Sequence, residues 1–345
     1  MRVVHLLGPL RASGMERMFV SGAPYFQQHG ITSTIVGQGR SHPFRAELES
    51  SGYDIRAIPS VRSARGLSGW SDILRELNPE VVHVHTEEAF AAVILIAHRQ
   101  APRARIIRTF HSYYEATGWW ATKRRVQAAL SDRYVDAFVV PTAEMAQHEA
   151  QFRRRCLVIP NWVEERFTTG RSNTPSGADL LIVGNCDDVK MHEIVLSAAI
   201  RNQWTVVHVG NEANATPHET RLLEELHARR LLTFRGVADS RVHMLSARLF
   251  VLPSRREGLS VALAEAIAMG MNCVVSDIRG MMWAQKAPLV STVPGWRPDA
   301  WDSGLAEALA THVPSSAQRA ARRFVRENLT PAVGVTQYRD LYLST

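Results

Sequence analysis

The chain has 345 residues, of which 46% are hydrophobic and 21% are charged. This length predicts two domains of ordinary globular composition, and no apolar run reaches the ~18 residues that a membrane-spanning helix needs. The three cysteines are scattered, which predicts a reducing compartment, the cytoplasm, with neither a disulfide framework nor a zinc site. The net charge of +7 favours anionic partners. No RNA-binding signature or zinc finger accompanies it, so specific nucleic-acid binding is not expected.

Short apolar runs alternate with helical patterns through the first half of the chain and predict a parallel α/β sheet. The runs are residues 3–7, 31–36, 55–58, 81–85, 105–111, 135–140 and 157–161. A loop with glycines follows the first run, as in a Rossmann-type half, although the G-x-G-x-x-G fingerprint is absent. The fold class predicted for this half is therefore a Rossmann-like α/β domain.

The segment from Trp119 to Arg133 mixes aromatic and cationic residues on an expected helix. Its hydrophobic face would include Trp119, Val126 and Leu130. Packing of this face in the protein core is the favoured interpretation. Peripheral contact with a membrane surface is the alternative.

The second half begins after a stretch rich in Thr, Ser, Gly and Pro, residues 167–178, which has the composition of a linker. Apolar runs then resume and predict a second βα-rich domain. They cover residues 180–184, 205–209, 232–234, 249–252 and 273–276. We therefore expect domains at residues 1–168 and 178–328.

No metal site is expected from the spacing of ligand-type residues. His83 and His85 alternate onto one face of a strand, but no third ligand accompanies them. The His-Glu pairs that begin at His148, His192 and His218 lack a second histidine four residues later, so none is a zincin motif.

The most informative stretch runs from residue 253 to residue 270, PSRREGLSVALAEAIAMG. Glu257 falls on the loop after a buried strand, and Glu265 falls in the apolar helix that Ser260 would cap. The amino end of a helix has free N–H groups that bind anions such as a diphosphate. Carboxylates on either side accept hydrogen bonds from hydroxyl groups. The pattern therefore indicates a ligand in which sugar is joined to phosphate.

This stretch resembles the E-x7-E signature of retaining GT-B glycosyltransferases, family 4 in particular. The resemblance implies two facing Rossmann-like domains with a cleft between them, the first binding the acceptor and the second the donor. It also implies that residues 329–345 form a helix that packs back on the first domain. In the family, the first Glu contacts the transferred sugar and the second holds the ribose. The resemblance assigns the sugar contact to Glu257 and the ribose contact to Glu265. It assigns backbone contacts with the sugar and phosphates to the intervening loop, residues Gly258, Leu259 and Ser260.

Further site residues follow from the same resemblance. His111, after its strand, would approach the donor sugar, and Lys190 would meet the diphosphate. Asn185 stands where the family has an arginine, and only Gly14 remains of the family's glycine pair. Either Arg255 or Arg256, next to Glu257, would compensate for the missing arginine, and Arg256 is assigned to donor binding, as is Gly236.

The activity implied is that of a retaining, metal-independent hexosyltransferase without a cofactor, acting in polysaccharide or glycoconjugate biosynthesis. It would move sugar from a nucleotide diphosphate-sugar, with UDP as the expected nucleotide, to a hydroxyl of a glycan, lipid-linked or small-molecule acceptor. We expect a cytoplasmic protein, with peripheral contact at the inner membrane face as the alternative. The competing interpretations are a nucleotide-sugar epimerase and a non-catalytic sugar-nucleotide binding protein.

Overall fold

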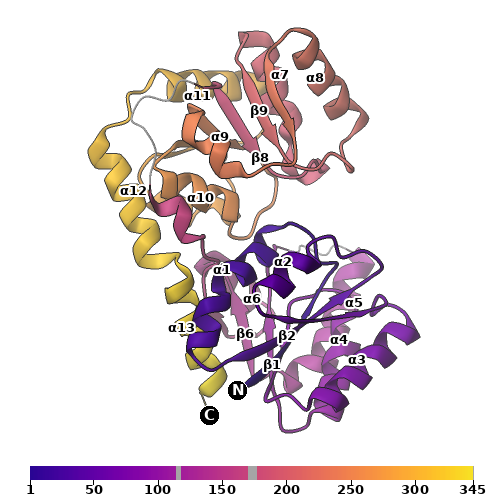
Figure 1. Ribbon diagram of the computed structural model, residues 1–345. Coiled ribbons are helices and arrows are strands. Elements are labelled where there is room, and N and C mark those ends of the chain that lie inside the picture. The colour runs from indigo at the N-terminus through magenta and orange to yellow at the C-terminus, as the bar shows by residue number, and fades with distance from the viewer. Residues whose placement is uncertain (114–117, 170–176, 345) are drawn as a thin grey trace. The chain divides into compact units, whose positions relative to one another are not determined.

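A computed structural model describes residues 1–113, 118–169 and 177–344. The chain divides into two compact units, residues Met1–Asn161 with Pro331–Thr345, and residues Trp162–Thr330. Each unit is built on one parallel β-sheet covered by helices (Figure 1). None of the helices in the described ranges is long and apolar enough to cross a membrane.

The first unit contains a seven-stranded sheet with the order β3-β2-β1-β4-β5-β6-β7. Its strands are β1 (Arg2–Leu7), β2 (Thr32–Gln38), β3 (Asp54–Ile58), β4 (Val81–Val84), β5 (Arg105–Thr109), β6 (Ala137–Val140) and β7 (Cys156–Val158). Its helices are α1 (Gly14–Gln28), α2 (Arg45–Ser50), α3 (Ala64–Leu77), α4 (Phe90–Gln100), α5 (Gly118–Ser131), α6 (Ala143–Ala150) and α13 (Pro331–Leu343), with a short 3-10 turn η1 (Asp132–Tyr134).

Side chains of β1 alternate between two hydrophobic layers, as the two-residue period of a strand requires. Val4 and Leu6 pack in the layer that contains Trp70 of α3 and Val93 of α4. Leu7 points to the other face, in the layer that contains residues of α1. Both faces of the sheet are therefore buried, which is why its strands are continuous apolar runs.

The C-terminal helix α13 belongs to the first unit and packs beside α1 (Figure 1). The Tyr342 hydroxyl shares a hydrogen bond of 2.8 Å with His83 Nδ1 in β4. The Tyr338 ring is tilted by 51° relative to the same imidazole, with ring centroids 5.3 Å apart. Helix α13 thus contributes to the core of the first unit, although it lies at the other end of the chain.

The second unit contains a six-stranded parallel sheet with the order β10-β9-β8-β11-β12-β13. Its strands are β8 (Leu180–Val183), β9 (Val206–Val209), β10 (Leu232–Gly236), β11 (Leu249–Leu252), β12 (Asn272–Ser276) and β13 (Val290–Val293). Its helices are α7 (His192–Asn202), α8 (Pro217–Ala228), α9 (Ser240–Ser246), α10 (Val261–Met269), α11 (Pro298–Ala310) and α12 (Ser315–Asn328), with 3-10 turns η2 (Glu165–Thr169), η3 (Asp188–Lys190), η4 (Arg279–Met281) and η5 (Ala284–Lys286).

The expected end of the first domain at residue 168 is wrong by seven residues, because Trp162–Thr168 belongs to the second unit. The N–H of Val163 donates to the carbonyl of Leu329 at 2.9 Å. Phe167 is fully buried in the hydrophobic core that α10 and α12 share. These contacts bind the segment, including the first residue of the expected linker, to the second unit. Most of that expected linker, residues 170–176, lies outside the described residues.

Candidate active site

In the second unit, the chain order reverses direction between neighbouring strands β8 and β11. From β8 the chain proceeds to β9 on one side, and from β11 to β12 on the other. Open α/β sheets bind ligands beyond the carboxyl ends of the strands at such a switch point. Lys190 follows β8 and Glu257 follows β11. The topology therefore directs both residues to the position where a ligand is expected.

The side chains of Lys190 and Glu257 meet at this switch point. Lys190 Nζ donates to Glu257 Oε1 at 2.6 Å. The same oxygen accepts a hydrogen bond of 2.7 Å from the Ser254 hydroxyl. The Lys190 side chain is 27% exposed and that of Glu257 is 11% exposed, so both remain accessible to a ligand. The hydrogen bonds fix one carboxylate oxygen of Glu257 beside a cation.

Backbone contacts hold the loop of Glu257 in place. The N–H of Arg255 donates to the carbonyl of Val189 at 2.8 Å, which links this loop to that of Lys190. Trp296 Nε1 donates to the carbonyl of Pro253 at 2.7 Å, and the Ser276 hydroxyl donates to that of Ser254. The two site-bearing loops are thereby fixed to each other, to the end of β12 and to the loop after β13.

The backbone of Gly280 packs closely against this loop. A Cβ placed on Gly280 would lie 2.0 Å from the carbonyl oxygen of Glu257. None of the loop-holding residues Gly280, Ser254, Ser276 and Trp296 was predicted from the sequence. Their contacts span up to 43 residues. Only Ser254, three residues before Glu257, had a local signal that could have identified it.

Helix α10 carries the second glutamate of the motif. Ser260 caps the helix by accepting a hydrogen bond from the N–H of Leu263 at 3.3 Å. Glu265 is 3% exposed and accepts a hydrogen bond of 3.2 Å from the Ser240 hydroxyl. Leu259 packs its side chain into the core, and Gly258 is buried. The described contacts therefore supply the polar partner that a carboxylate in an apolar helix requires.

The remaining donor-site candidates of this unit lie at the carboxyl ends of three different strands. Asn185, next to Gly184, accepts a hydrogen bond from the N–H of Asn211 at 2.9 Å, so its amide joins the loops after β8 and β9. Gly236 ends β10 with φ of +131°, a conformation that favours glycine. Arg256 is exposed beside Glu257. Its neighbour Arg255 pairs with Asp188 at 3.6 Å.

In the first unit, His111 follows β5 and ends a hydrogen-bonded chain of histidines. His111 Nε2 shares a hydrogen bond of 2.9 Å with His85 Nδ1, and His85 Nε2 shares one of 3.2 Å with His5 Nδ1. Burial lowers the pKa of His111 to about 4. His111 is therefore a neutral imidazole at neutral pH, and its orientation depends on His85, just after β4, and on His5 of β1.

Gly14 is the first residue of α1, which follows the switch-point strand β1. Ser13 caps this helix by accepting from the N–H of Met15 at 3.3 Å, and its hydroxyl also donates to Glu16. Gly14 thus lies at a helix N-terminus beyond the carboxyl edge of the first sheet, a position suited to an anionic ligand.

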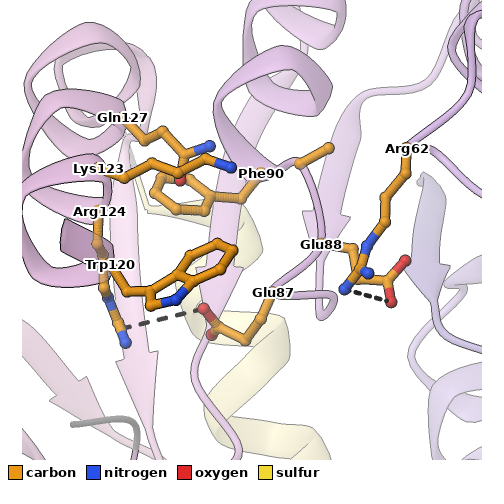
Figure 2. Close-up of a pocket in the computed structure, with 9 residues that line it drawn as sticks. Arg62, Glu87, Glu88, Phe90, Trp120, Lys123, Arg124 and Gln127 are labelled. Carbon is orange, nitrogen blue, oxygen red and sulfur yellow. Dashed lines mark ion pairs between the residues drawn. The ribbon is translucent and has the colours of Figure 1, made fainter. Parts of the chain in front are cut away.

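A pocket of about 520 Å³ lies in the first unit between the start of α4 and helix α5 (Figure 2). Its lining combines aromatic and charged side chains, namely Arg62, Glu87, Glu88, Phe90, Trp120, Lys123, Arg124 and Gln127, with Ala89. Glu88 pairs with Arg62 at 3.1 Å, and Glu87 accepts from Arg108 at 2.8 Å. Aromatic rings beside carboxylates and cations suit a carbohydrate or phosphorylated ligand.

The expectation that the apolar face of helix α5 packs in the protein core is wrong. Trp119 is 74% exposed and Trp120 is 60% exposed. Val126 and Leu130 are also exposed, whereas Arg124 is buried. The cation turns inward because Arg124 pairs with Glu149 at 3.7 Å and lies 4.0 Å from Glu87. The hydrophobic side chains consequently face away from the core.

Both halves of the chain match known glycosyltransferase families. Residues 12–167 match the model described as Glycosyltransferase Family 4, and residues 177–314 match the one described as Glycosyl transferases group 1. The chain is 25% identical to the EpsF protein of Bacillus subtilis strain 168, over 95% of this chain and 91% of that one. It is 27% identical to the GDP-mannose:cellobiosyl-diphosphopolyprenol alpha-mannosyltransferase of Xanthomonas oryzae pv. oryzae, over 81% and 79% of the two chains.

Among solved structures, the chain is similar to Anabaena Alr3699/HepE in complex with UDP-glucose, with a TM-score of 0.79 and 15% identity over 99% of each chain. The two parallel-sheet units agree with the GT-B fold of such neighbours. The chain is a glycosyltransferase of the GT-B fold. These matches do not favour an epimerase or a non-catalytic binding protein.

Proposed function

We propose that this protein is a retaining hexosyltransferase that uses a nucleotide diphosphate-sugar and a hydroxyl acceptor. The observation that carries the proposal is the contact of Lys190 with Glu257 at the switch point of the second sheet, next to the capped start of α10. Lys190 offers a positive charge to the diphosphate, and Glu257 offers a carboxylate to the sugar hydroxyls. The cation matches the diphosphate of such a donor, and the adjacent carboxylate matches its sugar.

Donor binding is assigned to the second unit. The N-terminus of α10, after Gly258, Leu259 and Ser260, would direct backbone N–H groups at the diphosphate. Glu265 would hold the ribose hydroxyls. Asn185, Gly236 and Arg256 complete the proposed donor site.

The donor nucleotide is proposed to be UDP. Support comes from the structural neighbour that was solved with UDP-glucose. A sequence relative is named for GDP-mannose instead. The proposed contacts involve ribose and diphosphate, not the base, so a panel of nucleotides must distinguish these donors.

The proposed reaction separates charge along the bond from sugar to diphosphate. Positive charge grows on the sugar while negative charge grows on the diphosphate, where Lys190 and the helix N-terminus stabilise it. The acceptor oxygen forms a bond to the anomeric carbon as the bond to phosphate breaks. A phosphate oxygen of the leaving group takes the acceptor proton. Attack on the same face retains configuration, and no divalent cation takes part. His111, as a neutral imidazole, would approach the donor sugar.

Acceptor binding is assigned to the pocket of the first unit (Figure 2). Lys123 Nζ lies 5.1 Å from the centroid of the Trp120 ring, so a cation and an aromatic face adjoin there. A sugar ring stacks on the aromatic face, and a linked phosphate pairs with the cation. A glycan, lipid-linked or phosphorylated small-molecule acceptor fits this lining.

Peripheral contact with the inner face of a membrane is part of the same proposal. Trp119 and Leu130 are exposed on α5, as are the cations Lys123 and Arg125. Exposed tryptophan beside basic side chains is typical of helices that lie on anionic lipid surfaces. Such contact would bring a lipid-linked acceptor to a cytoplasmic enzyme that serves polysaccharide or glycoconjugate synthesis.

The test combines nucleotide binding with sugar transfer. Thermal shifts with UDP, GDP and their sugars identify the donor, because a ligand of the folded state raises the Tm. With that donor, Glu257→Ala and Lys190→Ala should each abolish most transfer while preserving the far-UV circular dichroism spectrum. Lys286→Ala, at an exposed lysine of the same unit, serves as the control. Full transfer by both site variants would reject the proposal. Binding without transfer to any acceptor, or donor epimerisation without an acceptor, would favour the other interpretations.

A further inference from the structure

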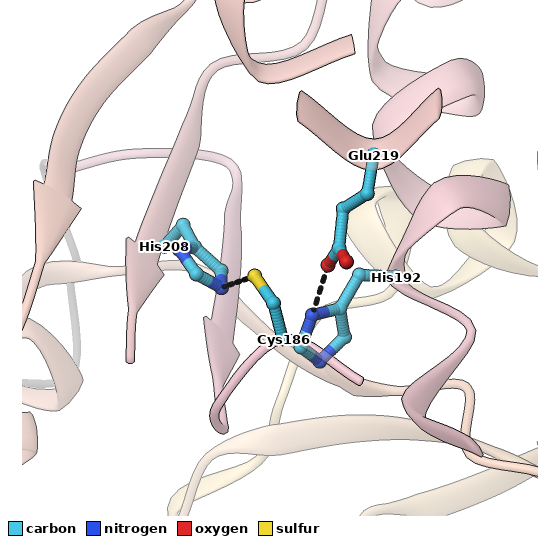
Figure 3. Close-up of side chains that lie close together, drawn as sticks. All are labelled: Cys186, His192, His208 and Glu219. Atoms are coloured by element: carbon cyan, nitrogen blue, oxygen red, sulfur yellow. Dashed lines mark hydrogen bonds and ion pairs between the residues drawn. The ribbon is translucent and has the colours of Figure 1, made fainter. Parts of the chain in front are cut away.

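Four buried polar side chains converge in the second unit, beside the loop that carries Lys190 (Figure 3). Cys186 follows β8, His192 begins α7, His208 lies in β9 and Glu219 lies in the first turn of α8. None of the four is more than 2% exposed. Thiol, imidazole and carboxylate groups rarely gather in a hydrophobic interior unless they bind one another or a metal ion.

The distances between the ligand atoms of the cluster fit a tetrahedrally coordinated metal ion. One ligand atom from each residue lies within 4.8 Å of those of the other three. Cys186 Sγ is 3.6 Å from His208 Nε2, and His192 Nδ1 is 2.9 Å from Glu219 Oε1. Zinc bonds of about 2.0–2.3 Å place tetrahedral ligands roughly 3.4 Å apart. Shifts of a few tenths of an ångström to about one ångström would therefore place all four atoms at bonding distance.

The charges also match a divalent cation. A Cys186 thiolate and a Glu219 carboxylate carry two negative charges, and neutral imidazoles add none. Binding of a divalent ion releases the thiol proton to solvent and leaves the buried site without net charge. Because the surrounding layer is hydrophobic, with Val195 and Leu223 among its members, neutralisation there is favourable.

An outer carboxylate is already present behind one of the imidazoles. His208 Nδ1 lies 3.7 Å from Glu212 Oε1, and it has no hydrogen-bond partner within the described ranges. Arg235 holds Glu212 from the other side through a bidentate pair. Metal-binding histidines commonly direct their second nitrogen at such a carboxylate, which fixes the ring.

We propose that Cys186, His192, His208 and Glu219 form a structural zinc site. Four protein ligands leave no position for substrate, so the ion takes no part in sugar transfer. It would join the loop after β8 to β9 and α8, and so hold the segment on which Asn185 and Lys190 lie. This site revises the expectation, drawn from cysteine spacing, that the chain has no zinc site.

The other histidine cluster of the described chain is less suitable. His83 shares hydrogen bonds with Tyr342 and Thr109, and His85 shares them with His5 and His111. Both ring nitrogens of His83 and of His85 already have partners, and only His5 Nε2 has none within the described residues. No thiolate or carboxylate is among the three candidate ligands. The Cys186 cluster is therefore the one that we assign to a metal.

The experiment uses the full chain produced in minimal medium with added Zn²⁺ or Co²⁺. Elemental analysis should find about one metal ion per chain. Cobalt protein should show a thiolate-to-cobalt charge-transfer band and the intense visible bands of tetrahedral Co²⁺. Cys186→Ser and Glu219→Gln should lower the metal content, and Cys186→Ser should remove the charge-transfer band. Cys273→Ser is the matched control, because Cys273 is buried in the same unit and lies outside the cluster.

Each result decides the proposal without any activity measurement. Metal-free wild-type protein with no charge-transfer band would overturn it, even if the cluster variants fail to fold. Cobalt bound without the band, or a band that survives Cys186→Ser, would show adventitious binding and would also overturn it. A band lost in Cys186→Ser and kept in Cys273→Ser supports it.

Discussion

Substitution of Gly280 by alanine tests whether the Glu257 loop must be held by close backbone contact. The added methyl group would lie 2.0 Å from the Glu257 carbonyl oxygen and 2.8 Å from its carbonyl carbon. Both atoms belong to the backbone, so no side-chain rotation relieves the overlap. The loop or η4 (Arg279–Met281) must move by more than an ångström to reach ordinary contact distance.

The expected effect is larger on catalysis than on stability. Overpacking of this kind costs about 1–3 kcal/mol, which for a unit of this size lowers the Tm by roughly 2–12 °C. Displacement of the Glu257 carboxylate by about 1 Å should reduce kcat/KM about a hundredfold. The assays are calorimetry of the free protein and initial rates of sugar transfer with the donor found in the nucleotide panel.

Gly8→Ala provides the control, because a Cβ at Gly8 meets nothing within 4 Å and the residue does not have positive φ. This variant should keep both the Tm and the transfer rate. If Gly280→Ala has the same Tm and rate as the native chain, the loop accommodates the methyl group. The claim that Gly280 positions Glu257 would then be refuted.

Two further predictions concern the first unit. Trp120→Ala should raise the KM for acceptor roughly tenfold, because Trp120 lines the pocket. Trp119→Ala, outside the pocket, should leave this KM unchanged and weaken co-sedimentation with anionic vesicles. Equal KM values in the two variants would exclude the pocket as the acceptor site. His5→Leu should make stability less dependent on pH. Burial lowers the pKa of His5 from 6.5 in the unfolded chain to about 3 in the folded one. Below about pH 6.5, the unfolded chain therefore binds a proton that the folded chain does not bind. This difference removes about 3 kcal/mol of stability by about pH 4.5. His83 and His85 face the same position. Parallel stability curves for the native and His5→Leu chains between pH 4.5 and 7.5, measured by urea unfolding, would contradict this origin of the acid sensitivity.

The parallel strands could be predicted from sequence because burial on both faces makes them continuous apolar runs. β11 and β8 are examples, with residues that lie almost entirely in the core. β13, with the sequence VSTV, was missed because it is short and partly exposed. Helix α5 misled the prediction for another reason. Its apolar residues follow the pattern of a core helix, but the burial of Arg124 depends on Glu149, 25 residues away.

The contacts within the candidate site were predictable from the sequence only where they are local. Glu257, Ser260 and Glu265 lie within one strand–loop–helix segment, so their spacing alone places them around the N-terminus of α10. The contact of Lys190 with Glu257 joins residues 67 positions apart. The four ligands proposed for zinc come from four elements, which explains why cysteine spacing gave no indication of them.

The resemblance implies an arginine–lysine pair in the donor site. This chain keeps only the lysine of that pair, Lys190, because Asn185 replaces the arginine. An ammonium group has three donor hydrogens, so Lys190 can retain Glu257 and still bind a phosphate oxygen. The value of such a contact depends on its being in place before charge develops in the transition state. With one cation lost, the position of the other becomes more important. The Arg255–Val189 hydrogen bond and the buried cluster beside α7 both restrict the loop that carries Lys190. Rigid support of one lysine is thus a physical alternative to binding the diphosphate with two flexible cations.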